Sequence, residues 1–209
     1  MNVSEEFSRH FEVCPLVAII RGVTPGEVEA IGDVLVEAGI RIIEVPLNSP
    51  EPFDSIVRLA ERVGDRALIG AGTVLTADNV EKVRQAGGRL IVAPNFNEAV
   101  VKASVAARMV SMPGVFTPSE AFAALDAGAN ALKLFPAEAA SPKMVHAMRA
   151  VLPREAPLII VGGVSPDAIP AWVEGGASGF GLGSGLYKPG KSAADVLETA
   201  RAYVAAVER

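Results

Sequence analysis

The sequence predicts an α/β protein folded as a single (β/α)8 barrel, the TIM-barrel architecture, and three observations support this fold class. Eight short apolar runs alternate with longer segments in which apolar residues have helical spacing. The start and end signals of the helical segments recur along the chain. The 209 residues suffice for one such barrel, and half of them are hydrophobic, which provides a large core.

The eight apolar runs are rich in Val, Ile, Leu and Ala and are bounded by Gly or Pro, as is typical of buried parallel strands. We expect strands over Val17–Arg21, Arg41–Pro46, Ala67–Gly70, Leu90–Ala93, Met109–Met112, Ala131–Phe135, Leu158–Gly162 and Ser178–Gly183.

The helical segments begin and end with the same few residue types. A Ser or Thr N-cap followed by Pro or Ala at the first helical position is favourable. Such pairs occur at Thr24-Pro25, Thr76-Ala77, Thr117-Pro118 and Ser165-Pro166. Glycine that can adopt the left-handed cap conformation ends four segments, at Gly39, Gly87, Gly128 and Gly175-Gly176. About eight strand–loop–helix–Gly units result, which is the number that a closed barrel needs.

An open, doubly wound sheet is the alternative architecture. It usually carries a G-x-G-x-x-G turn after the first strand, whereas this chain has Arg21-Gly22-Val23-Thr24-Pro25 there. No linker or shift in composition divides the chain, so we expect one domain over residues 1–209. We expect residues 1–14 to form a helical extension at its N-terminus.

The composition argues against several functional classes. The net charge is -5, from 19 basic and 24 acidic residues, so nothing attracts the chain to nucleic acid or to an anionic membrane. Cys14 is the single cysteine, and no CxxC, HxH or HExxH spacing occurs, so we expect no metal site. The first residues are acidic and polar, and no apolar run approaches membrane-spanning length. We therefore expect a soluble, cytoplasmic protein.

Lys133 is a charged residue inside a strand run, where the carboxyl ends of barrel strands carry the catalytic groups. Alternation places it on one face with Ala131 and Phe135, opposite two leucines. A lysine that points into the barrel is costly unless it is paired or deprotonated, and a neutral amine can attack a ketone. The alternative is a lysine that reaches solvent from the strand end, and the pattern alone leaves both open.

Glu44 and Arg21 are two further charged residues in the strand runs. Glu44 shares a face with Ile42 and Pro46, so it would face the same interior as Lys133. It could shuttle protons there or form a structural ion pair, and a lysine opposite it favours the first interpretation. Arg21 ends the first run, and its guanidinium suits a carboxylate or phosphate, with a strand-end salt bridge as an equal alternative.

Two glycine-rich segments follow the seventh and eighth runs, at Val161–Pro166 and Gly181–Gly185. Backbone N–H groups in these two loops commonly form the phosphate site of a barrel enzyme, and glycine lets the backbone approach the oxygens closely. Ser184 can add a hydroxyl donor. Tight barrel turns are the alternative, but two such segments at these positions favour a phosphate site.

At these residues the chain resembles the 2-keto-3-deoxy-6-phosphogluconate / 6-phosphogalactonate aldolase family, from about Pro15 to the C-terminus. The segments that carry this resemblance are Ile-Ile-Arg21-Gly, Ile-Glu44-Val-Pro-Leu-Asn48-Ser, Gly-Ala-Gly72-Thr73-Val, Ala-Pro94-Asn, Met112-Pro-Gly114, Leu-Lys133-Leu-Phe135-Pro-Ala, Val161-Gly-Gly163-Val and Gly183-Ser184. Their order and spacing together are highly specific.

The resemblance implies a class I aldolase that is a (β/α)8 barrel, usually a homotrimer, with no metal and no organic cofactor. It implies that Lys133 forms a Schiff base and that Glu44 is the general acid and base. The substrate-binding residues that it implies are Arg21 and Thr73 at the carboxylate end, Pro94 and Phe135 along the pocket, and Gly163, Gly183 and Ser184 at the phosphate, together with Val161 and Gly162 of the first glycine-rich segment.

Two features indicate the substrate type within the family. The segment Val45–Pro50 resembles the galactonate type, and so does Val161, where gluconate-type enzymes tend to carry Thr. The two substrates are epimers at C4, and a Thr hydroxyl could bond one orientation of the C4 hydroxyl. The segment Phe135–Ala139 is closer to the gluconate type.

The expected reaction is cleavage of 2-dehydro-3-deoxy-6-phospho-D-galactonate to pyruvate and D-glyceraldehyde 3-phosphate. A gluconate-type or dual-specificity aldolase is the first alternative. Remoter alternatives are a phosphate-binding barrel isomerase or synthase without a Schiff base, and a non-catalytic sugar-phosphate binding protein.

Overall fold

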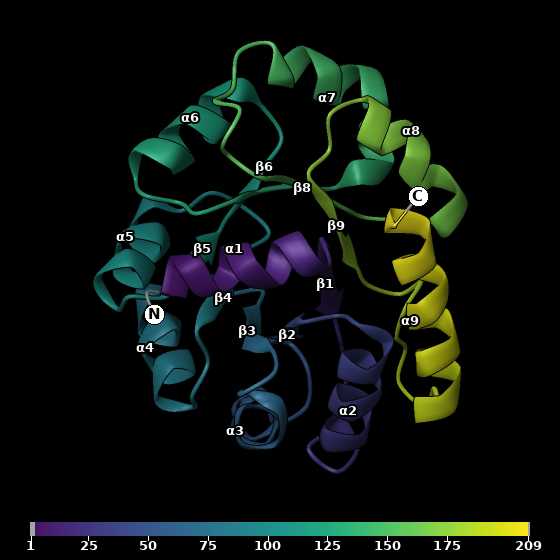
Figure 1. Cartoon of the computed structure of the whole chain (residues 1–209). Coiled ribbons are helices and arrows are strands. Elements are labelled where there is room, and N and C mark those ends of the chain that lie inside the picture. The colour runs from purple at the N-terminus through teal and green to yellow at the C-terminus, as the bar shows by residue number, and fades with distance from the viewer. Residues whose placement is uncertain (1–2, 209) are drawn as a thin grey trace.

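The computed structural model describes residues 3–208 and shows a ring of helices around a barrel of parallel strands (Figure 1). Its strands are β1 (Leu16–Ile19), β2 (Ile42–Pro46), β3 (Leu68–Gly72), β4 (Leu90–Val92), β5 (Val110–Met112), β6 (Gly114–Val115), β7 (Leu132–Leu134), β8 (Leu158–Val161) and β9 (Gly179–Leu182). All of the pairings among them are parallel, in the order β5-β4-β3-β2-β1-β9-β8-β7-β6. The predicted α/β barrel is confirmed.

The helices of the ring follow the strands along the chain. They are α2 (Val28–Ala38), α3 (Pro52–Val63), α4 (Ala77–Gln85), α5 (Glu98–Ala106), α6 (Pro118–Asp126), α7 (Pro142–Arg149), α8 (Ile169–Glu174) and α9 (Ala193–Val207). Two 3-10 helices, η1 (Ala137–Ala139) and η2 (Pro166–Ala168), lie in the loops after β7 and β8. None of the helices between residues 3 and 208 combines the length and the hydropathy that a membrane span requires.

Pro113 divides one barrel strand into β5 and β6, a division that the sequence did not predict. β5 pairs with β4, whereas β6 pairs with β7, so the two short strands occupy a single position in the barrel. The Lys133 amide donates to the Pro113 carbonyl at 2.9 Å, which continues the ladder toward β7. Gly114 fits beside the loop after β4 because a Cβ atom there would lie 2.2 Å from the Pro94 carbonyl oxygen. Eight strand positions therefore remain, as a (β/α)8 barrel requires.

The core has two layers, which follow from the alternation of side chains along each strand. An outer layer between strands and helices contains Ala18, Ile43 and both leucines of β7. The inner layer fills the barrel with the residues Val17, Ile19, Ile42, Leu68, Leu90, Val92, Val110, Met112, Ala131, Ile159 and Val161. The barrel is thus a packed core, and a polar side chain on an inward-facing position is conspicuous.

The helix α1 (Val3–Val13) crosses the end of the barrel at which the strands begin (Figure 1). Its Phe7 side chain is buried in the inner layer and stacks on Phe11, with 5.3 Å between the ring centroids. Phe11 in turn contacts the first residue of β9, Gly179, where a Cβ atom would lie 2.6 Å from the ring. The amino end of the barrel is closed in this way, which leaves the carboxyl end for a site. Residues 1 and 2 of the expected extension over 1–14 lie outside the described residues.

The helix boundaries agree with the expected caps at some positions and differ at others. Thr76 accepts a hydrogen bond from the Asn79 amide, and Thr117 forms a reciprocal capping box with Glu120. The Thr24-Pro25 pair instead begins a turn, because α2 starts only at Val28. The Ser165-Pro166 pair likewise opens the 3-10 helix η2, and α8 follows it.

Candidate active site

Lys133 lies in the middle of β7 and points into the barrel. The residue is only 4% exposed, and its Nζ atom lies 4.8 Å from the centroid of the Phe135 ring. The backbone pairs in register with Gly114 of β6 and Ile159 of β8, which fixes the position of the side chain. A lysine that extends to solvent from the strand end does not fit this burial.

Glu44 lies in the middle of β2 and is 1% exposed. Its Oε2 atom is buried and has no hydrogen-bond partner among residues 3–208. A Cβ atom on Gly72, at the end of β3, would lie 2.0 Å from Oε2 and 2.3 Å from Oε1. The carboxylate therefore lies against the Gly72 backbone, in a space that any larger residue at position 72 would fill.

Burial shifts the pKa values of both groups toward their neutral forms. Desolvation lowers the pKa of Lys133, helped by the positive charge of Arg21 and opposed by Glu44. Desolvation raises the pKa of Glu44 to about 7, and the charges of Lys133 and Arg21 act in the opposite direction. The site thus holds an amine that loses its proton more easily than usual and a carboxyl group that can take up or release a proton near neutral pH.

Arg21 lies just after β1, and its side chain joins two neighbouring loops. Nη1 donates to Asn48 Oδ1, in the loop after β2, at 2.5 Å. Nη1 and Nη2 each lie 3.5 Å from the hydroxyl oxygen of Thr73, in the loop after β3. Thr73 has a φ of 56°, an unusual value for a β-branched residue and one that often marks a functional position. The hydrogen-bond partners of the guanidinium are thus an amide and a hydroxyl, and among residues 3–208 no carboxylate forms the strand-end salt bridge with it.

A cavity of about 470 Å³ opens at the carboxyl end of the barrel, a size that suits a small-molecule ligand. Eight of the residues expected from the sequence line it, namely Arg21, Lys133, Phe135, Val161, Gly162, Gly163, Gly183 and Ser184. Glu44, Thr73 and Pro94 are not in its lining. Glu44 acts on Lys133 through its charge, Thr73 lies beside Arg21, and Pro94 lies against β6.

A larger cavity, of about 640 Å³, lies at the opposite end under α1. Its polar lining includes Glu6 and Arg89, which form an ion pair with each other at 2.5 Å. Barrel enzymes carry their chemistry at the carboxyl ends of the strands. The smaller cavity, which contains Lys133, is therefore the candidate active site.

The family profile of KDPG and KHG aldolases matches residues 8–199, which is most of the chain. The chain belongs to this aldolase family. Two curated relatives have been given galactonate-type names. The probable 2-dehydro-3-deoxy-6-phosphogalactonate aldolase of Rhizobium meliloti is 49% identical, over 93% of this chain and 92% of its own. The 2-dehydro-3-deoxy-6-phosphogalactonate aldolase of Escherichia coli K12 is 44% identical, over 92% and 94%.

Solved structures of family members superpose well on this aldolase. A native KDPGal structure matches with a TM-score of 0.91 and 43% identity, over 93% of this chain and 94% of the other. The KDPG aldolase of Legionella pneumophila, with pyruvate captured as a covalent carbinolamine intermediate, matches with a TM-score of 0.83 and 26% identity, over 93% and 96%. A carbinolamine joins a carbonyl carbon to an amine, so the chemistry of that relative requires an amine at its site.

The glycine-rich loops of the aldolase line the same cavity as Arg21, and two tyrosines hold them in place. Gly183 accepts hydrogen bonds from the amides of Leu186 and Tyr187, at 2.9 and 3.0 Å, which closes a tight turn. The Tyr187 hydroxyl donates to the Glu27 carboxylate, and the Tyr203 hydroxyl donates to the Val164 carbonyl at 2.9 Å. Both loops expected to bind phosphate are therefore fixed to neighbouring elements.

Several residues of the cavity did not appear among those expected from the sequence. They are Glu138, Tyr187, Lys188 and Tyr203, together with Asn48 next to Arg21. Tyr187 and Tyr203 are the only tyrosines in the chain and are 2% and 3% exposed. A tyrosine shortly after a glycine-rich turn was the one available signal. Within residues 3–208, no cluster of three or more His, Cys, Asp or Glu side chains is arranged to hold a metal ion.

Proposed function

We propose that this aldolase cleaves 2-dehydro-3-deoxy-6-phospho-D-galactonate to pyruvate and D-glyceraldehyde 3-phosphate through a Schiff base on Lys133. The observation that carries the proposal is the buried Lys133 amine, with its lowered pKa, in the cavity at the carboxyl end of the barrel. The names of the two curated relatives support the substrate. The carbinolamine in the Legionella enzyme supports an amine as the nucleophile.

The first half of the reaction forms the iminium ion. The neutral Lys133 amine attacks the C2 ketone, and a proton shift gives a carbinolamine. Glu44 in its protonated form donates to the departing hydroxyl group, which leaves as water. The pKa of Glu44, raised to about 7, keeps a useful fraction of this acid form near neutral pH.

The second half breaks the C3–C4 bond. The Glu44 carboxylate accepts the proton of the C4 hydroxyl, the C4 carbon becomes an aldehyde, and the bonding electrons move into the iminium to give an enamine. Glyceraldehyde 3-phosphate leaves, C3 of the enamine takes up a proton, and water hydrolyses the imine to pyruvate and free Lys133. Each proton that Glu44 releases in one step is thus recovered in another.

Two separate groups of residues would bind the two charged ends of the substrate. Arg21, with Thr73, would bind the carboxylate next to C2. The loops at Gly163 and at Gly183–Ser184 would bind the phosphate through backbone N–H groups and one hydroxyl. Pro94 and Phe135 would line the path between them. Anchoring both ends places C2 near Lys133, and such positioning is a large part of catalysis.

Val161 supports the galactonate epimer over the gluconate epimer. It lines the cavity at the end of β8 and offers no hydroxyl to a C4 substituent. The test is to compare kcat/KM for the two epimers, and we expect a preference for the galactonate. A strong preference for the gluconate epimer would contradict the assignment of substrate but leave the aldolase chemistry intact.

Reduction with borohydride in the presence of pyruvate tests the Schiff base itself. We expect a stable adduct on the peptide that contains Lys133, identified by mass spectrometry. An isomerase or synthase without a Schiff base gives no adduct, and a binding protein releases no pyruvate from the phosphorylated substrate.

A homotrimer, a cytoplasmic location and the absence of an organic cofactor are part of the same proposal. Light scattering of the purified protein checks the trimer.

Replacing Gly72 with Ala tests whether the position of the Glu44 carboxylate matters. The added methyl group would lie 2.0 Å from Oε2, so the carboxylate has to move. We expect kcat to fall about 100-fold, since displacements of about 1 Å can have this effect. Gly26→Ala is the control, because nothing lies within 4 Å of a Cβ atom there. Equal kcat values for the two variants would exclude a role for Glu44 in this position.

A further inference from the structure

We propose that Glu138 competes with the substrate for the phosphate end of the cavity and so limits the affinity for phosphorylated ligands. The inference rests on the proposed function, because it assumes that the loop at Gly162 and Gly163 binds the phosphate. Glu138 takes no part in the proposed reaction steps, and its role would be to set the affinity for the phosphate group.

The position of the Glu138 carboxylate carries the inference. The side chain extends from η1 and lies over the loop after β8. A Cβ atom on Gly162 would lie 2.1 Å from Glu138 Oε2, and one on Gly163 would lie 2.9 Å from Cγ and 3.2 Å from Oε1. Both glycines have positive φ values, of 124° and 64°. The bare backbone that would let phosphate oxygens approach is thus already in contact with another anion.

The charges around the cavity make this contact unusual. The ionisable lysines and arginine in its lining are Arg21, Lys133 and Lys188, which all suit an anionic ligand. Among the described residues of that lining, Glu138 is the one with a carboxylate. In the part of the chain that the structure describes, no Lys, Arg or His forms an ion pair with it. Its negative charge is therefore not neutralised by a neighbour before a phosphate arrives.

Competition of this kind weakens the binding of the substrate's phosphate group and leaves the binding of its carboxylate group unchanged. A dianion that enters the loop has to displace Glu138 or bind beside it, and like charges a few Å apart repel each other. Displacement is feasible because Glu138 is an exposed side chain on a short loop. The same repulsion favours departure of the phosphorylated aldehyde after cleavage, so a weaker phosphate end helps product release.

Glu138→Gln tests the charge without changing the size of the side chain. Binding of inorganic phosphate to the full-length protein is measured by calorimetry, which does not depend on turnover. We expect phosphate to bind about tenfold more tightly to Glu138→Gln than to the natural protein at low salt, with a smaller ratio at 1 M salt. Glu155→Gln is the matched control, since Glu155 is exposed and precedes β8 at the opposite end of the barrel. The control should bind phosphate as the natural protein does.

Three results would overturn the proposal. The first is phosphate affinity that is unchanged or lower in Glu138→Gln. The second is tighter binding in Glu138→Ala but not in Glu138→Gln, which would indicate steric blockage and not charge. The third is no phosphate binding by any of these proteins. Trapping of pyruvate on Lys133, measured in parallel, reports separately on the proposed chemistry, so its failure is distinguishable from that of the Glu138 inference.

Discussion

Replacement of Lys133 with Met abolishes cleavage, with an expected fall in kcat/KM of at least about 10⁴-fold. Methionine has nearly the length of lysine and a similar apolar stem, but it has no nitrogen to form an iminium. Without an iminium, the electrons of the C3–C4 bond have no acceptor. Release of pyruvate from the phosphorylated substrate, followed with a coupled assay, measures the loss.

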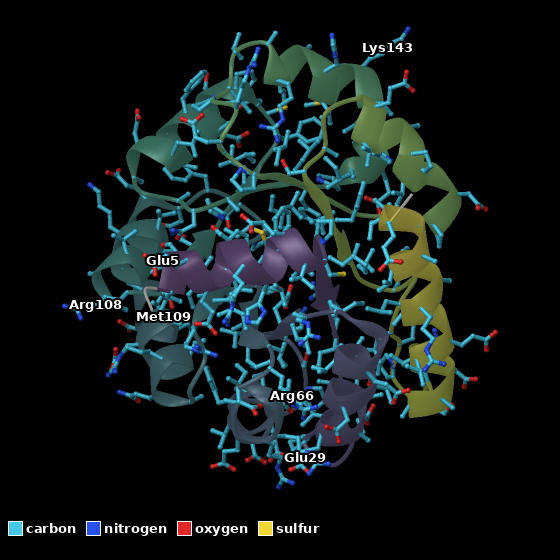
Figure 2. The ribbon with its side chains drawn as sticks, viewed as in Figure 1. Glu5, Glu29, Arg66, Arg108, Met109 and Lys143 are labelled. Atoms are coloured by element: carbon cyan, nitrogen blue, oxygen red, sulfur yellow. The ribbon has the colours of Figure 1, made fainter. Side chains whose placement is uncertain are left out.

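Lys143→Met is the matched control for this variant. Lys143 lies on α7 and points away from the barrel (Figure 2), so its replacement should leave kcat/KM unchanged. Borohydride with pyruvate should label Lys143→Met as fully as the natural protein and leave Lys133→Met unlabelled. Activity in Lys133→Met within tenfold of the natural value would show that another group provides the nucleophile.

Removal of the lysine also changes its neighbour. The positive charge of Lys133 lowers the pKa of Glu44, against the larger effect of burial. In Lys133→Met this opposing effect is absent, so the Glu44 pKa rises above its present value of about 7. The variant therefore carries a neutral Glu44 at neutral pH. That form is compatible with an apolar interior, and we expect Lys133→Met to fold.

The strands and the two central site residues could be predicted because their signals are local. Each barrel strand is a short apolar run, and alternation along a run decides which side chains face inward. A charged residue on an inward face is then visible without any knowledge of its neighbours, and this pattern singles out Lys133 and Glu44 as candidates. The β6 strand was missed because two residues after a proline form no such run.

The remaining features depend on contacts between segments that are distant in sequence. Gly72 matters because the Glu44 carboxylate lies against it, and the two residues belong to different strands. Glu138 and Gly162 meet only because the loops after β7 and β8 converge at the same end of the barrel. Tyr187 finds its partner, Glu27, 160 positions earlier in the chain. The residue types within one segment do not show which distant segment it will contact in the fold.

Replacement of Glu44 with Gln should make the aldolase slower and yet more stable. The amide of the replacement side chain cannot perform the proton transfer that cleavage needs, so we expect kcat to fall by about 10²- to 10⁴-fold. The natural enzyme should show a rise in kcat/KM as the pH increases through about 7, where Glu44 ionises. This rise should be absent in Glu44→Gln, and Glu29→Gln, on the outer face of α2 (Figure 2), should retain it.

The stability of Glu44→Gln distinguishes the proton shuttle from the structural ion pair that the sequence left open. The pKa of Glu44 is raised from 4.5 to about 7 in the folded state, so between these values the folded protein holds a proton that the unfolded chain has lost. Stability therefore falls as the pH rises through this window, and above it the buried carboxylate costs up to about 3 kcal/mol. We expect Glu44→Gln to unfold at higher urea concentration than the natural protein at pH 8, with the difference vanishing near pH 4.5. A structural ion pair predicts the opposite sign at pH 8, because its loss would leave Lys133 buried without a counter-charge.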